Sequence, residues 1–192
     1  MEASWNLAEF SWVNVDELHG LTRSKKTKPI LAKTMTAIIA DQTMIPRFLL
    51  KTIEGNAECD ATAMVCKGIG EDYWVQPKDK VVDRYDFADF ADNGWVSMTP
   101  KPDKEVDAFQ VTRAMCGSEG FAIRAGNWGE KATVDGEEVM VHFGRPGDYI
   151  CIDPTDTSDR WIVLRTLFEN SYESVEGAST GTAVEEEAEV SV

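Results

Sequence analysis

The feature of this sequence that most constrains its fold is an internal repeat. When the chain is shifted by 76 residues without a gap, residues 28–75 align with residues 104–151 and nine positions are identical. Self-similarity at a fixed spacing indicates two copies of one supersecondary unit. The identical pairs are Lys28/Lys104, Ala32/Ala108, Thr36/Thr112, Glu54/Glu130, Met64-Val65/Met140-Val141, Gly68/Gly144 and Asp72-Tyr73/Asp148-Tyr149.

The second copy has the composition of short strands separated by turns. Its strand-type segments are 137–143, 149–152 and 160–164, which are rich in β-branched and aromatic residues. Gly144–Gly147 is a turn signal, and 153–159 reads as a polar loop. Elsewhere the pattern predicts a strand at 106–115, a loop at 76–80, a short strand at 81–82, a helical turn at 87–92 and, at 166–172, a short helix or a turn that closes the unit. Residues 29–41 suit either a helix or a strand.

We therefore predict an α+β, β-rich fold with two tandem small β-meander or barrel-like repeats and short helices. The predicted organisation is an N-terminal arm at 1–27, a degenerate first repeat at 28–92, a linker at 93–103, a second repeat at 104–173 and a disordered acidic tail at 174–192.

The N-terminal arm carries large apolar side chains. Trp5, Phe10 and Trp12 are candidates for docking a protein partner. Alternatively, the arm packs on its own domain or on a neighbouring copy, because most tryptophans are largely buried.

The charge of the chain restricts its partners. There are 34 acidic and 19 basic residues, which give a formal net charge of −15, and residues 173–192 contribute six glutamates and no base. A surface of this sign repels phosphate backbones and anionic membranes, so no nucleic-acid or membrane partner is expected. No apolar signal segment opens the chain and the four cysteines form no C-x-x-C pair, so a cytoplasmic location is expected.

The segment Arg145-Pro-Gly-Asp-Tyr-Ile150, with Phe168 and Tyr172 after it, resembles the small PGDYG family of bacterial and phage proteins. Ile150 stands in place of the last glycine of the motif. The resemblance covers about residues 104–173, with a degenerate copy at 28–87 in which Gly70-Glu-Asp-Tyr73 replaces the Pro-Gly-Asp-Tyr turn. It implies a structural unit and no particular activity.

The motif has two interpretations. In the first, Gly147 supplies a positive φ for a tight turn, Asp148 hydrogen-bonds the nearby backbone, and Tyr149 anchors the next strand. In the second, a ligand pocket lies between the repeats and is lined by Arg145, Asp148, Tyr149, Asp72 and Tyr73. No residue is assigned a catalytic role, and neither a metal site nor a cofactor is predicted, because close pairs of zinc ligands and nucleotide-binding fingerprints are absent.

These observations favour a non-enzymatic binding or assembly protein that acts through protein–protein contacts, with homo-oligomerisation possible and the protein partner unknown. The alternative is a small-ligand enzyme or sensor with its pocket between the repeats. A third hypothesis, supported only by the net charge, is a phage-type acidic inhibitor of a host protein.

Overall fold

The computed structural model describes residues 7–34, 48–52, 55–59, 62–126, 129–134 and 136–180. Strands predominate in these residues, with two α-helices of seven residues each. The strands are β1 (Phe10–Trp12), β2 (Leu21–Lys26), β3 (Ile30–Thr34), β4 (Phe48–Thr52), β5 (Gly55–Cys59), β6 (Ala63–Lys67), β7 (Tyr73–Pro77), β8 (Tyr85–Phe90), β9 (Val96–Pro100), β10 (Glu105–Gln110), β11 (Gly120–Arg124), β12 (Glu130–Val134), β13 (Glu137–Gly144), β14 (Tyr149–Asp153), β15 (Asp156–Val163) and β16 (Tyr172–Thr180). The helices are α2 (Lys78–Arg84) and α3 (Arg165–Ser171).

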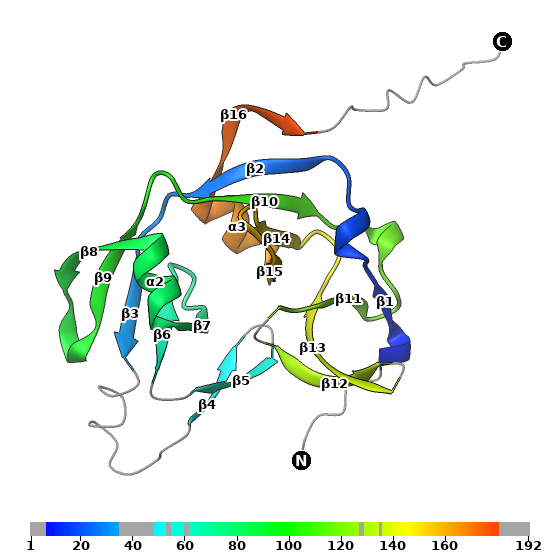
Figure 1. The fold of residues 1–192 in the computed structure, drawn as a ribbon, viewed down its shortest axis with the longest axis horizontal. Coiled ribbons are helices and arrows are strands. Elements are labelled where there is room, and N and C mark those ends of the chain that lie inside the picture. Colours follow the sequence, from blue (N-terminus) through cyan, green and yellow to red (C-terminus); the bar gives the residue numbers. More distant parts are fainter. Residues whose placement is uncertain are drawn as a thin grey trace.

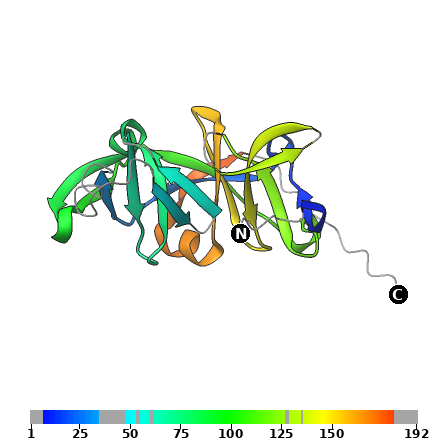
Figure 2. The same cartoon turned by 90° about the horizontal axis from the view of Figure 1, so that it is seen from below.

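These strands form two five-stranded sheets, a four-stranded sheet and a hairpin. The first five-stranded sheet has the order β7-β6-β3-β9-β8, and the second has the order β15-β14-β10-β2-β16. The four-stranded sheet has the order β1-β11-β13-β12, and β4 pairs with β5. Figures 1 and 2 show the first sheet at one end of the molecule, the second in the middle, and the four-stranded sheet at the other end.

The hydrophobic core is divided among these layers. One cluster lies under α2 on the first sheet and includes Ile30, Ala32 and Val81. Both faces of the second sheet are buried, and successive residues of its strands point to opposite faces. Cys151 faces the cluster around Phe168 of α3, whereas the neighbouring residues of β14 pack in the cluster that contains Phe121 of β11. The second sheet is thus the central layer of the molecule.

The two five-stranded sheets have the same order of corresponding elements. β3, β6, β7, α2 and β8 of the first match β10, β14, β15, α3 and β16 of the second. The remaining strands are exchanged, because β2 runs directly into β3 but lies in the second sheet, while β9 runs directly into β10 but lies in the first. Matching backbone hydrogen bonds close the two exchanges, from Thr27 N–H to Ser171 O at 2.8 Å and from Lys101 N–H to Arg84 O at 3.0 Å.

The predicted β-rich class is confirmed, but none of the described sheets closes on itself as a barrel-like unit would. The predicted repeats are not confirmed, because the 76-residue register does not match the strand pairing. A shift of 76 residues places β6 against β13, yet β6 pairs with β3 and β7, whereas β13 pairs with β11 and β12. The matching topology instead places Trp74 against Trp161 and Tyr85 against Tyr172, a shift of 87 residues.

Several local predictions need correction. Residues 87–92, predicted as a helical turn, mostly belong to strand β8, which is held by antiparallel pairing with β9. The predicted loop at 76–80 and strand at 81–82 are replaced by the end of β7 and by α2. The polar loop at 153–159 is shorter than predicted, because β15 begins at Asp156. The closing segment, which suited either a short helix or a turn, forms α3, and residues 30–34 form a strand.

The predicted arm, linker and tail also have defined places where the structure describes them. Residues 7–26 of the arm supply β1, which pairs in parallel with β11, and β2, which is an inner strand of the second sheet. The linker 93–103 contains β9, an inner strand of the first sheet. Residues 174–180 of the tail belong to β16, and residues 181–192 lie outside the described part.

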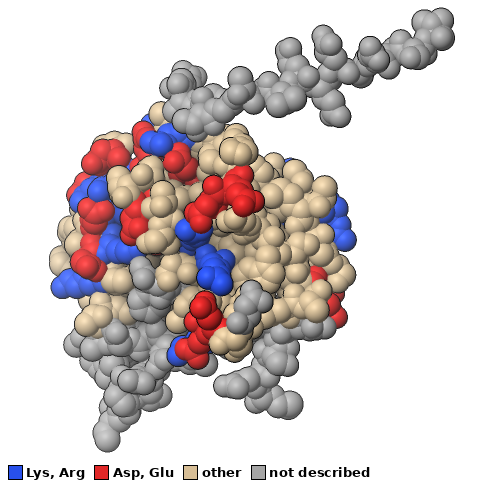
Figure 3. Space-filling model, turned by 45° about the vertical axis from the view of Figure 1, so that its right-hand side comes forward, with Lys and Arg blue, Asp and Glu red and all other residues tan. Residues whose placement is uncertain are grey.

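The surface is unevenly charged. In Figure 3, acidic and basic side chains are interspersed over one part of the molecule, whereas the right-hand part of that view carries few charges. Within the described residues, no helix has the length and apolar composition that crossing a membrane requires.

Candidate functional site

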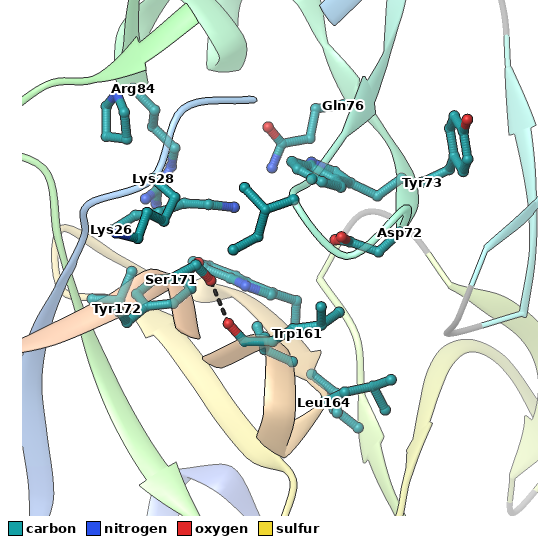
Figure 4. A pocket seen from close by; sticks show the side chains of 18 of the residues that line it. Lys26, Lys28, Asp72, Tyr73, Gln76, Arg84, Trp161, Leu164, Ser171 and Tyr172 are labelled. Carbon is teal, nitrogen blue, oxygen red and sulfur yellow. Dashed lines mark hydrogen bonds between the residues drawn. The ribbon is translucent and has the colours of Figure 1, made fainter. Parts of the chain in front are cut away.

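A cavity of about 150 Å³ lies where the two five-stranded sheets meet. Its wall combines β7 and the β6–β7 turn of the first sheet with β15, α3 and β16 of the second. The links β2–β3 and β9–β10, the junction of α2 and β8, and Gly129 and His142 from the region of the four-stranded sheet also line it. Figure 4 shows Gln76 and Trp161 approaching this space from opposite sides, with Tyr172 beside Lys26. Because both sheets contribute to the wall, neither sheet alone would form the cavity.

The aromatic side chains of the wall occupy matching positions in the two sheets. Trp74 of β7 corresponds to Trp161 of β15, and each is followed eleven residues later by a tyrosine that directly follows the short helix, Tyr85 or Tyr172. All four side chains line the cavity. Burial raises the pKa of Tyr85 and of Tyr172, so both phenols remain protonated at neutral pH.

Lys26, the last residue of β2, reaches the cavity between two aromatic rings. Its Nζ lies 4.6 Å from the ring centre of Trp74 and 5.6 Å from that of Tyr172, distances at which a cation is attracted to a ring face. No ion pair joins it to a carboxylate of the described residues. Burial lowers the pKa of Lys26 because the ammonium loses hydration, and the negative charge of Asp72 opposes this shift.

Arg84, the last residue of α2, occupies the corresponding region beside the other tryptophan. Its guanidinium carbon lies 5.2 Å from the ring centre of Trp161. The same guanidinium forms an ion pair with Asp153 and lies 3.9 Å from Asp159 Oδ2, which also lies 2.8 Å from Lys80 Nζ. The charges beside Trp161 are therefore compensated within the protein.

The pKa of Asp153 reflects this network. Burial by itself would raise it, but hydrogen bonds from the hydroxyl and the backbone N–H of Thr155 and the charge of Arg84 outweigh burial, and the pKa is lowered. Asp153 therefore stays ionised and paired at neutral pH.

Two further polar side chains of the wall, Asp72 and Gln76, come from the β6–β7 turn and from β7. Asp72 lines the cavity, but its Oδ1 accepts a hydrogen bond from Gly70 N–H at 3.2 Å instead of pairing with Lys26. The side-chain oxygen of Gln76 is buried and accepts no hydrogen bond from the described residues. A buried acceptor of this kind is costly to leave unsatisfied, so it favours a bound group with a hydrogen-bond donor.

Of the five residues predicted to line a pocket, Asp72 and Tyr73 line this cavity. Arg145 is exposed, and its backbone N–H donates to Asp148 Oδ2 at 2.9 Å. Asp148 is buried, and its other oxygen accepts from Arg165 N–H at 3.0 Å, so both oxygens bind backbone. Tyr149 stacks on Phe168 with ring centres 3.9 Å apart.

This geometry matches the structural interpretation of the motif. Gly147 has a φ of +94°, which glycine adopts without strain, and the bonds to Asp148 hold the turn against the start of α3. Phe168 stacks in turn on Tyr172, with ring centres 4.6 Å apart. The motif thus supports the tyrosine of the cavity wall from behind without lining the cavity.

The predicted docking residues of the N-terminal segment lie away from the cavity. Phe10 is half-buried, and its ring centre is 4.8 Å from that of Phe143. Trp12 is 40% exposed at the end of β1. Trp5 lies outside the described residues.

Sequence reasoning missed most of the wall, namely Lys26, Trp74, Gln76, Tyr85, Arg84, Trp161 and Tyr172. A signal for four of them was present, because Trp-x10-Tyr occurs twice at a spacing of 87 residues. Nothing in the local sequence marks Lys26, whose neighbours belong to two different sheets.

The cavity has the features of a non-covalent binding site, because aromatic side chains line it together with charged and polar ones such as Lys26, Asp72 and Gln76. Among the residues that the structure describes, no group of three or more His, Cys, Asp or Glu side chains is placed to hold a metal ion. No protein-family model, curated protein or solved structure matches the chain.

Proposed function

We propose that this protein binds a small molecule in the cavity between its two five-stranded sheets. The observation that carries the proposal is the wall itself, in which Trp74 and Tyr85 of one sheet face the same space as Trp161 and Tyr172 of the other. Aromatic side chains around a cavity, with polar groups that can orient the bound molecule, are typical of sites for small ligands. The size of the cavity fits a molecule of about one ring.

We further infer that the two sheets are diverged copies of one unit. Their matching strand order, the two exchanged strands and the pairs Trp74/Trp161 and Tyr85/Tyr172 support this inference. In this view the cavity arose at the junction of the copies, where each copy could change independently of the other.

A thermal-shift screen of small metabolites and ring compounds tests the proposed function. A ligand at 100 times its Kd stabilises the fold by about 2.7 kcal/mol, which raises Tm by several degrees. The Trp74→Phe and Trp161→Phe variants should each lose part of the ligand-induced change in tryptophan fluorescence. Trp12→Phe is the matched control, because Trp12 lies on β1 outside the cavity wall. A broad screen without any stabilising compound would contradict the proposal.

A second candidate function is self-association through strand β8. This edge strand carries Phe87 and Phe90, which are 55% and 80% exposed and whose ring centres lie 5.0 Å apart. An edge strand with exposed aromatic side chains can pair with another copy. Light scattering on the wild type and on the Phe87→Ser/Phe90→Ser double variant tests this function, and a concentration-independent monomer in both would exclude it.

A further inference from the structure

The cationic side chains around the cavity differ in whether a carboxylate pairs with them. Arg84 pairs with Asp153, Lys104 Nζ lies 2.8 Å from Asp83 Oδ2, and Arg160 Nη2 lies 3.2 Å from Asp16 Oδ1. Two further lysines line the cavity, and of these Lys28 is exposed to solvent. Lys26 is half-buried and has no carboxylate partner in the described part of the chain.

This arrangement is costly unless a negative charge joins it. A desolvated ammonium is destabilised relative to one in water, and contacts with aromatic faces recover only part of the loss. The carboxylate of Asp72 contributes favourably at longer range, but its Oδ1 is engaged by the backbone of Gly70. An anion placed in the cavity would form a direct ion pair with Lys26, and this pair would be stronger than one in bulk water because the rings of Trp74 and Tyr172 shield the ammonium from solvent.

The walls also restrict the shape of the anion. The ammonium lies between the rings of Trp74 and Tyr172, and Trp161 lines the same cavity from the second sheet. A flat ring would contact these surfaces more completely than a branched chain would. A volume of about 150 Å³ leaves room for one ring and its substituent.

We infer, building on the proposed function, that the ligand of this cavity is a small planar carboxylate whose charged group pairs with Lys26 and whose ring lies among the cavity tryptophans. The site thereby selects for negative charge inside a protein whose net charge is −15. Ligand recognition then depends on one cation supplied by the exchanged strand β2.

Three ring compounds of nearly equal size and shape separate charge from shape. Benzoate is an anion, benzamide is neutral and benzamidine is a cation at neutral pH, and binding of each can be measured by calorimetry or ligand-observed NMR. We expect benzoate to bind at least about ten-fold more tightly than either of the others. Tighter binding of benzamide or benzamidine would overturn the inference but leave the proposed function standing. Failure of all three to bind would also overturn it, and the wider screen then decides the proposed function separately.

Substitutions test the role of Lys26 directly. Lys26→Met keeps a long apolar side chain between the rings, and we expect it to weaken benzoate binding about ten-fold or more while leaving benzamide binding unchanged. Lys28→Met is the matched control, because it removes a neighbouring exposed charge of the same wall and should change benzoate binding less than about three-fold. Lys26→Arg keeps the charge and should retain the preference for benzoate, which also covers the case of a misfolded Lys26→Met. Equal benzoate affinity in wild type and Lys26→Met would refute the assignment.

Phenyl phosphate distinguishes a carboxylate from a phosphate ligand. A carboxylate ligand fits the small cavity better, so we expect benzoate to bind more tightly than phenyl phosphate. The reverse order, with the same dependence on Lys26, would overturn the choice of a carboxylate.

Discussion

Trp74 and Trp161 occupy matching positions in the two sheets, but the charges beside them are balanced differently. Beside Trp161, the cation comes from the end of α2 as Arg84, and it is neutralised by Asp153 and by the nearby Asp159. At the end of the matching helix α3 stands Ser171, whose hydroxyl donates to the backbone of its own helix. Beside Trp74 the cation comes from β2 as Lys26, and no described carboxylate pairs with it.

The difference shows how one architecture can carry a structural and a functional version of the same contact. Asp72 matches Asp159, since each stands two residues before its tryptophan. Asp159 contacts Lys80 and Arg84, whereas Asp72 accepts a hydrogen bond from Gly70 N–H within its own β6–β7 turn. A compensated pair of charges fixes two elements together, whereas an uncompensated charge is available to a ligand.

The largest expected effect on stability comes from the packing of the two short helices, α2 and α3. Phe168 of α3 matches Val81 of α2, and both are buried against their sheets. Phe168→Ala removes a ring that stacks on Tyr149 and Tyr172, so we expect a loss of about 4 kcal/mol in the free energy of unfolding, against about 2 kcal/mol for Val81→Ala. Urea denaturation with a shared m-value measures both losses. Equal losses would mean that the aromatic stack adds nothing to the packing of α3.

The next effect separates the two cations. Arg84→Met leaves Asp153 half-buried without its partner, and we expect a loss of about 2–3 kcal/mol. Lys26→Met removes a desolvated charge that has no ion pair, so its free energy of unfolding should change by less than about 1 kcal/mol. A loss for Lys26→Met as large as that for Arg84→Met would show that both cations are structural.

Lowering the pH tests whether Asp153 is the partner of Arg84. The lowered pKa of Asp153 means that its stabilising contribution is fully present above the ordinary pKa of an aspartate, about 3.9, and is lost as the pH falls through the lower value in the folded protein. The difference in stability between wild type and Arg84→Met should therefore be constant from pH 7 to about pH 5. It should shrink as the pH falls further, and the same denaturation series at each pH measures it. A difference that is unchanged at the lowest pH at which the protein folds would exclude Asp153 as the partner.

A smaller loss of stability is expected from substitutions in the two turns that contain Asp148 and Asp72, which align in the sequence. Asp148 accepts hydrogen bonds from the backbone N–H groups of Arg145 and Arg165. Asp148→Ala leaves both donors without their acceptor, so we expect it to lower the free energy of unfolding by about 2 kcal/mol. Asp72→Ala loses one bond, to the exposed N–H of Gly70, and should cost less than about 1 kcal/mol. Thermal unfolding measures both losses, and equal losses would show that Asp72 holds its turn as firmly as Asp148 does.

The sequence predicted the strand-rich class, and a short helix or turn where α3 lies, but its ungapped alignment of the two halves does not match the strand pairing. The shift of 76 residues holds for Ala32 and Ala108 in the central strands. It then fails because Cys66 follows Ala32 by 34 residues, whereas Cys151 follows Ala108 by 43, and the longer segment contains most of the four-stranded sheet. An ungapped comparison cannot accommodate such a difference in length.

The site was harder to predict than the strands for a physical reason. Phe87 and Phe90 are three residues apart, which fits a helix, yet pairing with β9 makes the segment a strand. Likewise, the surroundings of Lys26 depend on the exchange of β2 into the other sheet, which brings it beside Trp74 and Tyr172. Contacts set by tertiary pairing leave no periodic pattern in the nearby sequence.

The smallest effect concerns the reactivity of the thiols and compares matched positions again. Cys66 and Cys151 both lie fully buried on inner strands of the five-stranded sheets, and burial raises the pKa of the Cys66 thiol to about 12. Cys116 is half-buried, and its pKa is also raised by burial. We expect a disulfide reagent at pH 8 to modify Cys116 in the folded protein well before Cys66 or Cys151, because the reacting thiolate needs access to the reagent.

Peptide mapping by mass spectrometry after timed labelling measures this order residue by residue. Cys116→Ser is the control, because it removes the most accessible of these three thiols and replaces it with a side chain of similar size. Rapid modification of Cys66 but not of Cys151 in the folded protein would mean that the first sheet opens more readily than the second. That result would break the equivalence of the two sheets in stability, although they share a strand order, and would assign the lower stability to the sheet that contributes Trp74 to the cavity.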